Sequence, residues 1–509
     1  MAAGGGAEGV FLAYHEPDII NILTLISFFL FLALSEWLTD KIFRAGLIGQ
    51  IIVGLIYGVP LADILEINWQ ETFLALGYVG LLLIIFEGGL TIRLDLLRQN
   101  FLLSIVAALL GVLTPIALSF ALLYAGFGHA PLEAFIVGTA LCSTSLGTTF
   151  VVINSASTDT DYSQTRIGTV LISAAVLDDV CGLVLVSVIH QLRGIAEDGD
   201  MKLGWIIGRP ILASGLLAIL TPLIAKFVAG PLFRRFLEKP LANFKHVSNI
   251  LLMTVVLCAF LAIAAFAGAS MLFGAFLAGA FLSSLPSKEK GPAGLRDHDL
   301  ERTETTPFVG TFEHYLSGPQ KFILQPLFFA SIGFAIPFVE LWTGEVIWKG
   351  VVFTILMVFS KLVVGLVVPA WDVISAATSA RSAPPANEKM SARKAAAAGW
   401  APATLLGTAM VARGEIGLLI IQIGLNETPF LTRKAFVIGV WAIVLNTIIG
   451  PVSVGVLLKK AGSQIASDKT WGIKSKPQET DVESVILSDQ TGPDPTSPGG
   501  GREESRGGT

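Results

Sequence analysis

The chain has 509 residues, of which 53% are hydrophobic and 14% are charged, and its mean hydropathy is +0.72. A soluble domain carries about 25% charged residues, so this composition excludes an ordinary soluble protein and indicates a polytopic membrane protein. The net charge of -5 is small and gives no reason to expect a nucleic acid as a partner. The sequence contains neither a G-x-x-x-x-G-K-[ST] phosphate loop nor an H-E-x-x-H motif, so we expect no nucleotide, no cofactor and no enzymatic activity.

A window of about 20 residues, the length that crosses the hydrocarbon core of a bilayer, predicts about thirteen membrane-spanning helices. In chain order the predicted spans are 19–38, 46–61, 72–91, 101–126, 132–153, 166–190, 205–232, 248–266, 269–285, 322–342, 347–371, 399–425 and 435–458. The chain therefore divides into a short N-terminal segment, a membrane domain and a tail, at residues 1–18, 19–458 and 459–509.

Lys and Arg gather in every second connection between the predicted spans. By the positive-inside rule this pattern places the N-terminus outside and the tail in the cytosol. The sequon NET at Asn426 then falls on an outer connection. The tail has the Pro, Gly, Ser and acidic content of a disordered segment. We expect that removing residues 470–509 leaves the activity of the membrane domain intact.

Two adjacent carboxylates, Asp178 and Asp179, stand near the middle of the span 166–190. An ionisable side chain at the bilayer centre costs about 2.5 to 3.5 kcal/mol, and such residues usually face a cavity and carry function. Neighbouring positions on a helix point about 100° apart, so the two carboxylates are expected to have different roles. Lys361, near the middle of the span 347–371, is the natural counterion for one of them.

Two spans contain sequences that are typical of an interrupted helix. In the fifth span the polar cluster consists of Ser143, Thr144, Ser145 and Thr148, with Gly147 among them. In the twelfth span the charged cluster consists of Arg413, Gly414 and Glu415, with Gly417 as a second position where the helix could open. Discontinuous helices at corresponding places in two halves of a chain indicate a transporter site.

Two further charged residues lie toward the cytoplasmic ends of their predicted spans. For Glu87 a functional role and simple contact with the interface are equally open. Lys226 is expected to extend its side chain to the interface.

Seven motifs follow one another along residues 20–458: FEGGLTIRLDLLR, STSLGTT, AAVLDDVCGLVL, SMLFGAFLAGAFLSS, PLFFASIGFAI, SKLVVG and MVARGEIGLLI. Their order and spacing resemble the cation/proton antiporter superfamily, in its monovalent cation:proton antiporter-2 branch. The resemblance implies an all-α fold of about thirteen transmembrane helices, an inverted repeat with two crossing broken helices. It implies a secondary active transporter that exchanges Na⁺ or K⁺ for protons by alternating access.

The resemblance also assigns roles to the candidate residues. Asp179 would bind the cation or the proton, and Asp178 would pair with Lys361. The first broken helix would be lined by Ser143, Thr144, Ser145 and Thr148, and the second crossing formed by Arg413, Gly414 and Glu415. Two Asp and one Lys, in place of the Asn-Asp pair of electroneutral members, favour electrogenic exchange. We also expect a homodimer, in the plasma membrane or in an internal endosomal or vacuolar membrane.

Three other classes of protein were considered. An intramembrane aspartyl protease needs two carboxylates that face each other from different helices, whereas these are adjacent on one helix. A cation channel could use a ring of acidic residues, but a buried lysine beside them argues against it. A non-transporting sensor on the same fold would differ from a transporter in failing to dissipate a pH gradient when a cation is added.

Overall fold

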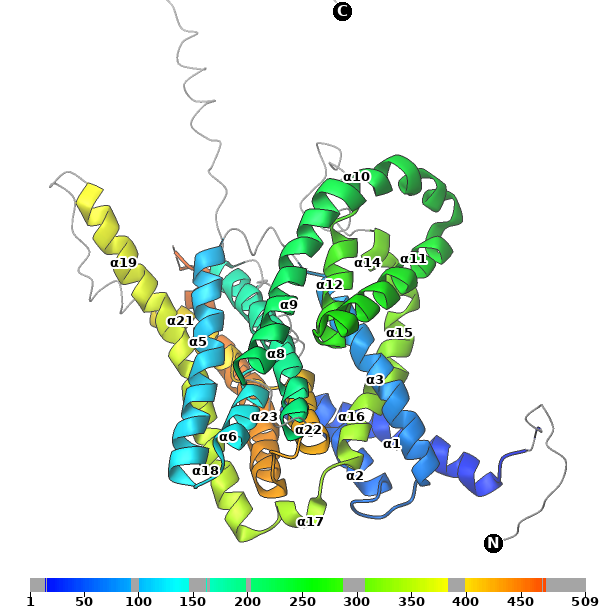
Figure 1. Cartoon of the computed structure of the whole chain (residues 1–509). Coiled ribbons are helices and arrows are strands. Elements are labelled where there is room, and N and C mark those ends of the chain that lie inside the picture. Colours follow the sequence, from blue (N-terminus) through cyan, green and yellow to red (C-terminus); the bar gives the residue numbers. More distant parts are fainter. Residues whose placement is uncertain are drawn as a thin grey trace, which may run out of the picture.

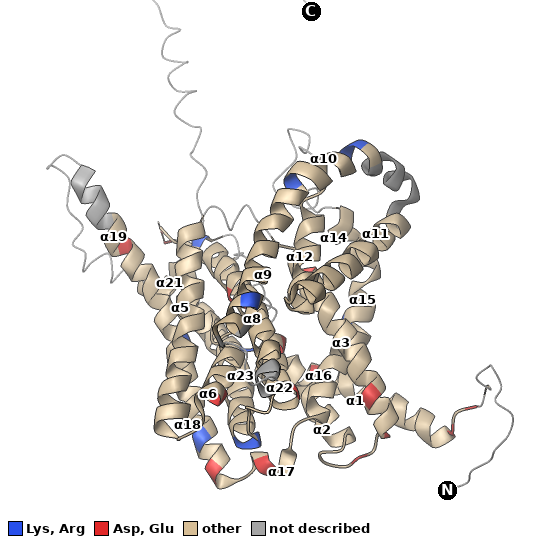
Figure 2. Ribbon diagram, in the orientation of Figure 1, with Lys and Arg blue, Asp and Glu red and all other residues tan. Residues whose placement is uncertain are grey.

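In the part of the chain that the computed structural model describes, all regular secondary structure is helical (Figure 1). The described residues are 14, 16–92, 100–145, 162, 165–197, 203–286, 307–382, 399–468 and 470–472. Eight helices among them are long and apolar enough to cross a membrane, and three shorter apolar helices accompany them. Charged side chains lie mainly at the two ends of the helices (Figure 2), as a bilayer requires. The all-α class is thus confirmed, while the count of about thirteen spans stays a prediction.

One set of helices, which we call the scaffold group, packs together through glycine contacts. It consists of α1 (Ile19–Phe43), α2 (Gly46–Tyr57), α3 (Ile67–Leu90), α11 (Glu238–Ala267), α12 (Met271–Ser283), α14 (Pro307–Tyr315), α15 (Ser317–Pro319), η5 (Gln320–Leu324) and α16 (Gln325–Phe334). A Cβ added to Gly54 of α2 would collide with the carbonyl oxygen of Ala330 in α16. A Cβ added to Gly89 of α3 would likewise collide with the carbonyl oxygen of Phe276 in α12. Small residues at helix contacts let backbones approach closely, as is usual in membranes.

The second set, which we call the core group, contains the predicted site. It consists of α5 (Phe101–Ser119), η1 (Phe120–Gly126), α6 (Pro131–Ala140), α8 (Arg166–Glu197), α18 (Gly344–Leu362), η6 (Val363–Leu366), α19 (Val367–Ser382), α21 (Trp400–Ala409), α22 (Glu415–Glu427) and α23 (Arg433–Ala466). The group is also held by glycine contacts: a Cβ on Gly365 would collide with the carbonyl oxygen of Ala403.

The remaining helices connect the two groups. They are α9 (Leu203–Ile224), η3 (Ala225–Ala229), α10 (Gly230–Leu232), η4 (Phe233–Leu237) and α17 (Phe338–Leu341). Of these, α9 packs along α8 of the core group and also reaches α11 and α12 of the scaffold group.

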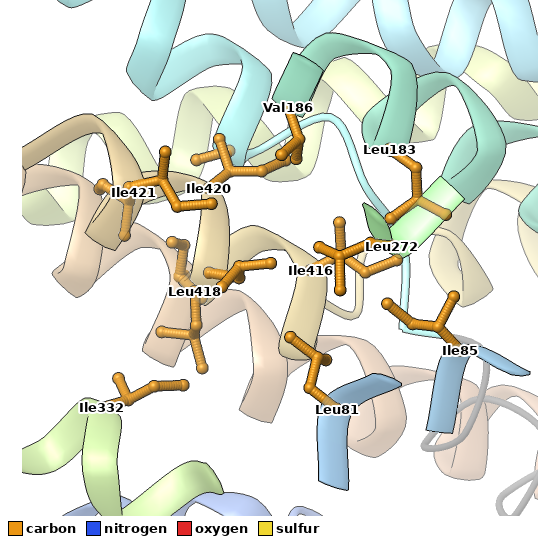
Figure 3. Close-up of a cluster of buried hydrophobic side chains, with 14 of the residues drawn as sticks. Leu81, Ile85, Leu183, Val186, Leu272, Ile332, Ile416, Leu418, Ile420 and Ile421 are labelled. Carbon is orange, nitrogen blue, oxygen red and sulfur yellow. The ribbon is translucent and has the colours of Figure 1, made fainter. Parts of the chain in front are cut away.

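Branched aliphatic side chains fill the boundary between the two groups (Figure 3). The core group contributes Leu183 and Val186 from α8 with Ile416, Leu418, Ile420 and Ile421 from α22, and the scaffold group contributes Leu81, Ile85, Leu272 and Ile332. Each of these side chains is less than 10% exposed. The boundary is therefore mostly apolar, and α22 lies between the groups. Two hydrogen bonds also cross it, from the N–H of Ser270 to the hydroxyl of Ser187 at 2.7 Å and from the side chain of Gln422 to the carbonyl oxygen of Ile332 at 3.5 Å.

The folded region extends further along the chain than the sequence indicated. Helix α23 runs to Ala466, past the expected boundary at residue 458, and Thr470–Gly472 are folded against the core group. The physical reason is that apolar residues continue at helical spacing beyond 458, and Leu458, Ala461 and Ile465 are all buried. The rest of the predicted tail, residues 473–509, and residues 1–13 lie outside the described residues.

Candidate functional site

Two interruptions of helical structure meet at the centre of the core group. Helix α6 ends at Ala140, and the chain from Cys142 to Ser145 is not helical. The second interruption separates the end of α21 from the start of α22. At the crossing the backbone N–H of Ser145 donates to the carbonyl oxygen of Ala412 at 2.9 Å. A Cβ on Gly414 would lie 2.7 Å from the Cβ of Ser145, so the crossing requires a glycine there.

Helix α23 supports the second interruption from behind. The hydroxyl of Thr447 donates to the carbonyl oxygen of Arg413 at 3.0 Å. A Cβ on Gly450 would lie 2.5 Å from the backbone nitrogen of Ala412, so this glycine lets the helix approach the break. These contacts partner backbone groups that an interrupted helix leaves free, as a bilayer demands. Gly417 lies inside α22 and does not interrupt it.

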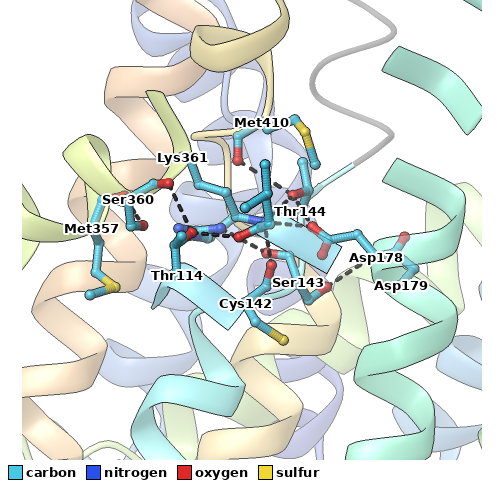
Figure 4. Close-up of polar contacts among 12 residues, drawn as sticks. Thr114, Cys142, Ser143, Thr144, Asp178, Asp179, Met357, Ser360, Lys361 and Met410 are labelled. Carbon is cyan, nitrogen blue, oxygen red and sulfur yellow. Dashed lines mark hydrogen bonds and ion pairs between the residues drawn. The ribbon is translucent and has the colours of Figure 1, made fainter. Parts of the chain in front are cut away.

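The structure brings Asp178 and Lys361 together (Figure 4). The ammonium group of Lys361 lies 2.5 Å from Oδ2 of Asp178, and both side chains are 0% exposed. Lys361 also donates to the carbonyl oxygen of Cys142 at 2.5 Å and to the hydroxyl of Thr144 at 3.1 Å. The hydroxyl of Thr144 in turn donates to Oδ2 of Asp178 at 2.6 Å. The three donors of Lys361 are therefore satisfied, two of them by the first interruption.

Asp179 points in a different direction from Asp178, toward Ser143 (Figure 4). The hydroxyl of Ser143 donates to Oδ1 of Asp179 at 2.8 Å. Asp179 is partly exposed, whereas Asp178 is buried. Glu415, the first residue of α22, is close enough to Asp179 for electrostatic repulsion. The two adjacent carboxylates thus differ in partner and in access.

Arg413 is buried beside the first interruption. Its side chain is 0% exposed, and its Nη1 donates to the carbonyl oxygen of Ser143 at 3.2 Å. Lys361 donates to the neighbouring carbonyl oxygen of Cys142, so two cationic side chains, Arg413 and Lys361, bind carbonyl groups just beyond the C-terminal end of α6. A helix C-terminus carries a partial negative charge, so these cations stabilise the interrupted end.

Sequence reasoning missed two residues of α5. The hydroxyl of Thr114 donates to the carbonyl oxygen of Ser360 at 3.0 Å, next to Lys361. A Cβ on Gly111 would lie 3.2 Å from Nζ of Lys361 and 3.3 Å from Oδ1 of Asp178. The signal in the sequence was a glycine and a hydroxyl one turn apart in an otherwise apolar span.

Two other predicted residues lie elsewhere, and a third is not described. Thr148 lies outside the described residues. Glu87 accepts a hydrogen bond of 2.8 Å from the side chain of Gln320, within the scaffold group. Lys226 is exposed and its ammonium lies 5.2 Å from the ring centre of Phe227.

A helical membrane bundle in which two interruptions of helical structure meet beside a buried Asp–Lys pair and a second, partly exposed Asp has the architecture of a secondary transporter. The chain belongs to the sodium/hydrogen exchanger family, because the family model for the transmembrane region of sodium/hydrogen exchangers matches residues 24–460. It is accordingly a multi-pass integral membrane protein. This finding confirms the resemblance to the cation/proton antiporter superfamily.

Individual relatives cover most of the chain. It is 23% identical over 447 residues to a Na⁺/H⁺ antiporter of Enterococcus hirae, covering 87% of this chain and 99% of the relative. It is 24% identical over 418 residues to the Na⁺/H⁺-K⁺ antiporter GerN of Bacillus cereus, covering 81% of this chain and 90% of the relative. The solved structure of the sodium proton antiporter MjNhaP1 from Methanocaldococcus jannaschii superposes with a TM-score of 0.57 at 16% identity, covering 87% of this chain and 98% of the other. The fold is therefore the antiporter fold.

Proposed function

We propose that this protein exchanges a monovalent cation, Na⁺ or K⁺, for protons, and that Asp179 binds the two ions in turn. The observation that carries the proposal is the contrast between the two carboxylates. Asp178 is buried and paired with Lys361, whereas Asp179 is partly exposed and has the hydroxyl of Ser143 as its hydrogen-bond partner. The relatives named as Na⁺/H⁺ and Na⁺/H⁺-K⁺ antiporters support the same activity.

The groups around Asp179 suit a small hard cation. Carboxylate and hydroxyl oxygens are the ligands that such cations prefer, and Asp179 and Ser143 offer them side by side. An isolated carboxylate is costly in a poorly hydrated site, so binding either a proton or a cation stabilises it. Because both ions act on the same oxygens, they compete, and competition for one site is the requirement for coupled exchange.

The packing suggests which part of the molecule moves. Within each group, backbones are locked together at glycines such as Gly54, Gly89 and Gly365. The boundary between the groups instead consists mainly of Leu, Ile and Val side chains, which keep similar contacts when the surfaces slide, and sliding would have to break the two hydrogen bonds that cross it. We therefore infer that the core group moves as a unit against the scaffold group and exposes Asp179 to each side alternately. The homodimer expected from the sequence remains part of this proposal.

The test is exchange in proteoliposomes that contain a pH-sensitive dye. Lithium, sodium, potassium or rubidium is added outside acid-loaded vesicles, and the proposal expects proton efflux with at least one of them. Asp179→Asn should abolish exchange, because an amide neither carries a charge nor titrates. It should still insert and fold, since a buried neutral amide costs less than a carboxylate.

A matched control is Glu345→Gln, which removes a half-exposed carboxylate at the start of α18 and should exchange as wild type. Wild-type exchange by Asp179→Asn would move the site elsewhere. If Asp179→Asn were active while Asp178→Asn were inactive, the roles of the two carboxylates would be reversed.

A further inference from the structure

The residues that follow α23 form a compact turn, which we call the C-terminal turn and which comprises Ser467, Asp468 and Thr470–Gly472. Oδ1 of Asp468 accepts hydrogen bonds from the backbone N–H groups of Thr470 at 2.8 Å and Trp471 at 2.9 Å. The backbone N–H of Gly472 returns to the carbonyl oxygen of Asp468 at 2.9 Å. An aspartate that bonds the backbone ahead of it is a standard way to fix a turn. Here the turn directs Trp471 inward.

Trp471 is the largest fully buried side chain among the described residues, at 1% exposure. It belongs to an apolar cluster formed by α5, α8, α19, α21 and α23, which includes Leu103, Ile167, Leu171, Val368 and Leu405. Its indole N–H lies 3.1 Å from both carboxylate oxygens of Asp372 in α19. The guanidinium carbon of Arg166 lies 4.9 Å from its ring centre, within cation–π distance. A side chain with this many specific partners is not a loosely attached tail residue.

The backbone of the turn caps helix α8. The first N–H groups of a helix have no partner inside it. In α8 the N–H of Arg166 donates to the carbonyl oxygen of Gly472 at 3.2 Å, and that of Ile167 to the carbonyl oxygen of Trp471 at 3.1 Å. The side chain of Arg166 also reaches Asn100, at the start of α5, at 3.3 Å. The turn therefore completes the helix that carries Asp178.

Both helices that the turn holds lead directly to the buried ion pair. Along α8, Asp178 follows Arg166 by twelve residues, which at about 1.5 Å per residue is about 18 Å. Along α18, η6 and α19, Lys361 precedes Asp372 by eleven residues, which is about 18 Å because the four residues of η6 form a 3-10 helix with a rise of about 2.0 Å each. Trp471 thus joins the start of α8 to the first half of α19, and the two helical runs that it joins carry Asp178 and Lys361. A shift of either helical run along its axis would change the 2.5 Å contact between Lys361 and Asp178.

We propose that Trp471 is a positioning residue for ion exchange: the C-terminal turn sets the register of α8 against α18–α19 and thereby the contact between Asp178 and Lys361. The inference rests on the proposed function, and it assigns to the segment after the membrane domain a part in the machinery itself. It also changes the expected effect of truncation: removal of residues 473–509 should leave exchange intact, whereas removal of residues 470–509 should not.

The first arm of the test measures docking of the turn without reference to transport. Hydrogen exchange of peptides that cover residues 165–170 is compared in the full chain, in a chain that ends at Gly472 and in a chain that ends at Ala466. We expect equal protection in the first two proteins and faster exchange of the Arg166 and Ile167 amides in the third, because their acceptors are gone. Equal protection in all three proteins would overturn the proposal.

The second arm measures the pH at which exchange in proteoliposomes is half-maximal. Trp471→Ala should shift this pH by about 0.4 to 1.5 units, the size expected for coupling between distant sites. Trp471→Phe keeps an aromatic ring for the cluster and for Arg166 but loses the bond to Asp372, so its profile should fall between those of wild type and Trp471→Ala. The chain that ends at Gly472 should match wild type. A merely structural role would reduce the amount of folded protein but leave the pH profile of that protein unchanged.

The two proposals fail differently. If the wild-type protein does not exchange, the proposed function fails, and the hydrogen-exchange arm still reports on docking. If the wild type exchanges and Trp471→Ala shows the wild-type pH profile, only the positioning role is overturned. A shifted profile in the chain that ends at Gly472 would place the required segment beyond the turn, which also overturns the assignment to Trp471.

Discussion

Replacing Lys361 by alanine tests the buried ion pair, and its cost can be worked out from the contacts. The substitution removes the 2.5 Å ion pair and leaves Asp178 at 0% exposure with Thr144 as its remaining partner, since Oδ1 has none. Breaking a buried pair by removing one partner typically costs about 3 to 5 kcal/mol. Lys361→Ala should therefore lower the thermal unfolding midpoint in detergent markedly.

The double variant Asp178→Asn/Lys361→Ala gives the decisive comparison. Adding Asp178→Asn to Lys361→Ala removes the unpaired charge and leaves a neutral amide that keeps Thr144 as a partner but is not fully hydrogen-bonded, which costs about 1 to 3 kcal/mol. The double variant should thus be about 2 kcal/mol more stable than Lys361→Ala alone. Unfolding midpoints of the wild type, both single variants and the double variant provide the cycle. If the two single losses add to within about 0.5 kcal/mol, the residues do not interact and the reasoning is refuted.

The same position should control exchange. Lys361→Ala is expected to alter pH dependence and electrogenicity in liposomes beyond what its loss of stability explains. Lys361→Arg should not rescue the activity, because a guanidinium does not release its proton and its planar fork does not fit a site built for an ammonium group. Wild-type pH dependence and electrogenicity in Lys361→Ala would exclude Lys361 from the mechanism.

Gly111→Ala places a methyl group 3.2 Å from Nζ of Lys361, so it should displace the ion pair and slow exchange in liposomes while the protein stays folded. Gly215→Ala in α9 is its matched control, because nothing lies within 4 Å of the added carbon, and equal exchange rates in the two variants would contradict this reading. Gly54→Ala should instead prevent accumulation of folded protein, as judged by size-exclusion chromatography, because the new methyl group collides with the backbone of Ala330. In sealed inside-out vesicles, whose cytoplasmic face is outward, added protease should cleave the segment after Gly472, while Asn426 should be protected. Protection of the C-terminal segment from the protease would overturn the predicted count of spans.

The amino-acid sequence by itself determined the class of the protein and the location of its apolar helices. Hydrophobic stretches of about 20 residues and charged connections are local properties, and a bilayer imposes them on each segment separately. The cost of a buried charge is equally local, so Asp178, Asp179, Lys361 and Arg413 stood out before any fold was known. The interruption near Gly414 was also indicated, although the sequence did not exclude Gly417 as the place where the helix opens.

Which of these groups meet is a matter of tertiary structure. Asp178 and Lys361 are 183 residues apart in the chain, and the rotation of two helices decides that Asp178 rather than Asp179 faces the lysine. Arg413 was expected at the second crossing, but its acceptor, the carbonyl oxygen of Ser143, belongs to the first. A backbone carbonyl has no signature in a sequence, since every residue has one, and only an interrupted helix leaves it available.

Trp471 is the clearest case of a contact that the sequence alone does not predict. It lies in a stretch whose composition is that of a disordered segment, and composition says how much apolar surface a segment can bury by itself. The pocket that buries Trp471 is supplied by α5, α8, α19, α21 and α23, and its hydrogen-bond acceptor is Asp372, 99 residues earlier. A single anchor residue changes the average composition of a tail very little. Its burial therefore depends on a surface that exists only after the helices of the core group have packed.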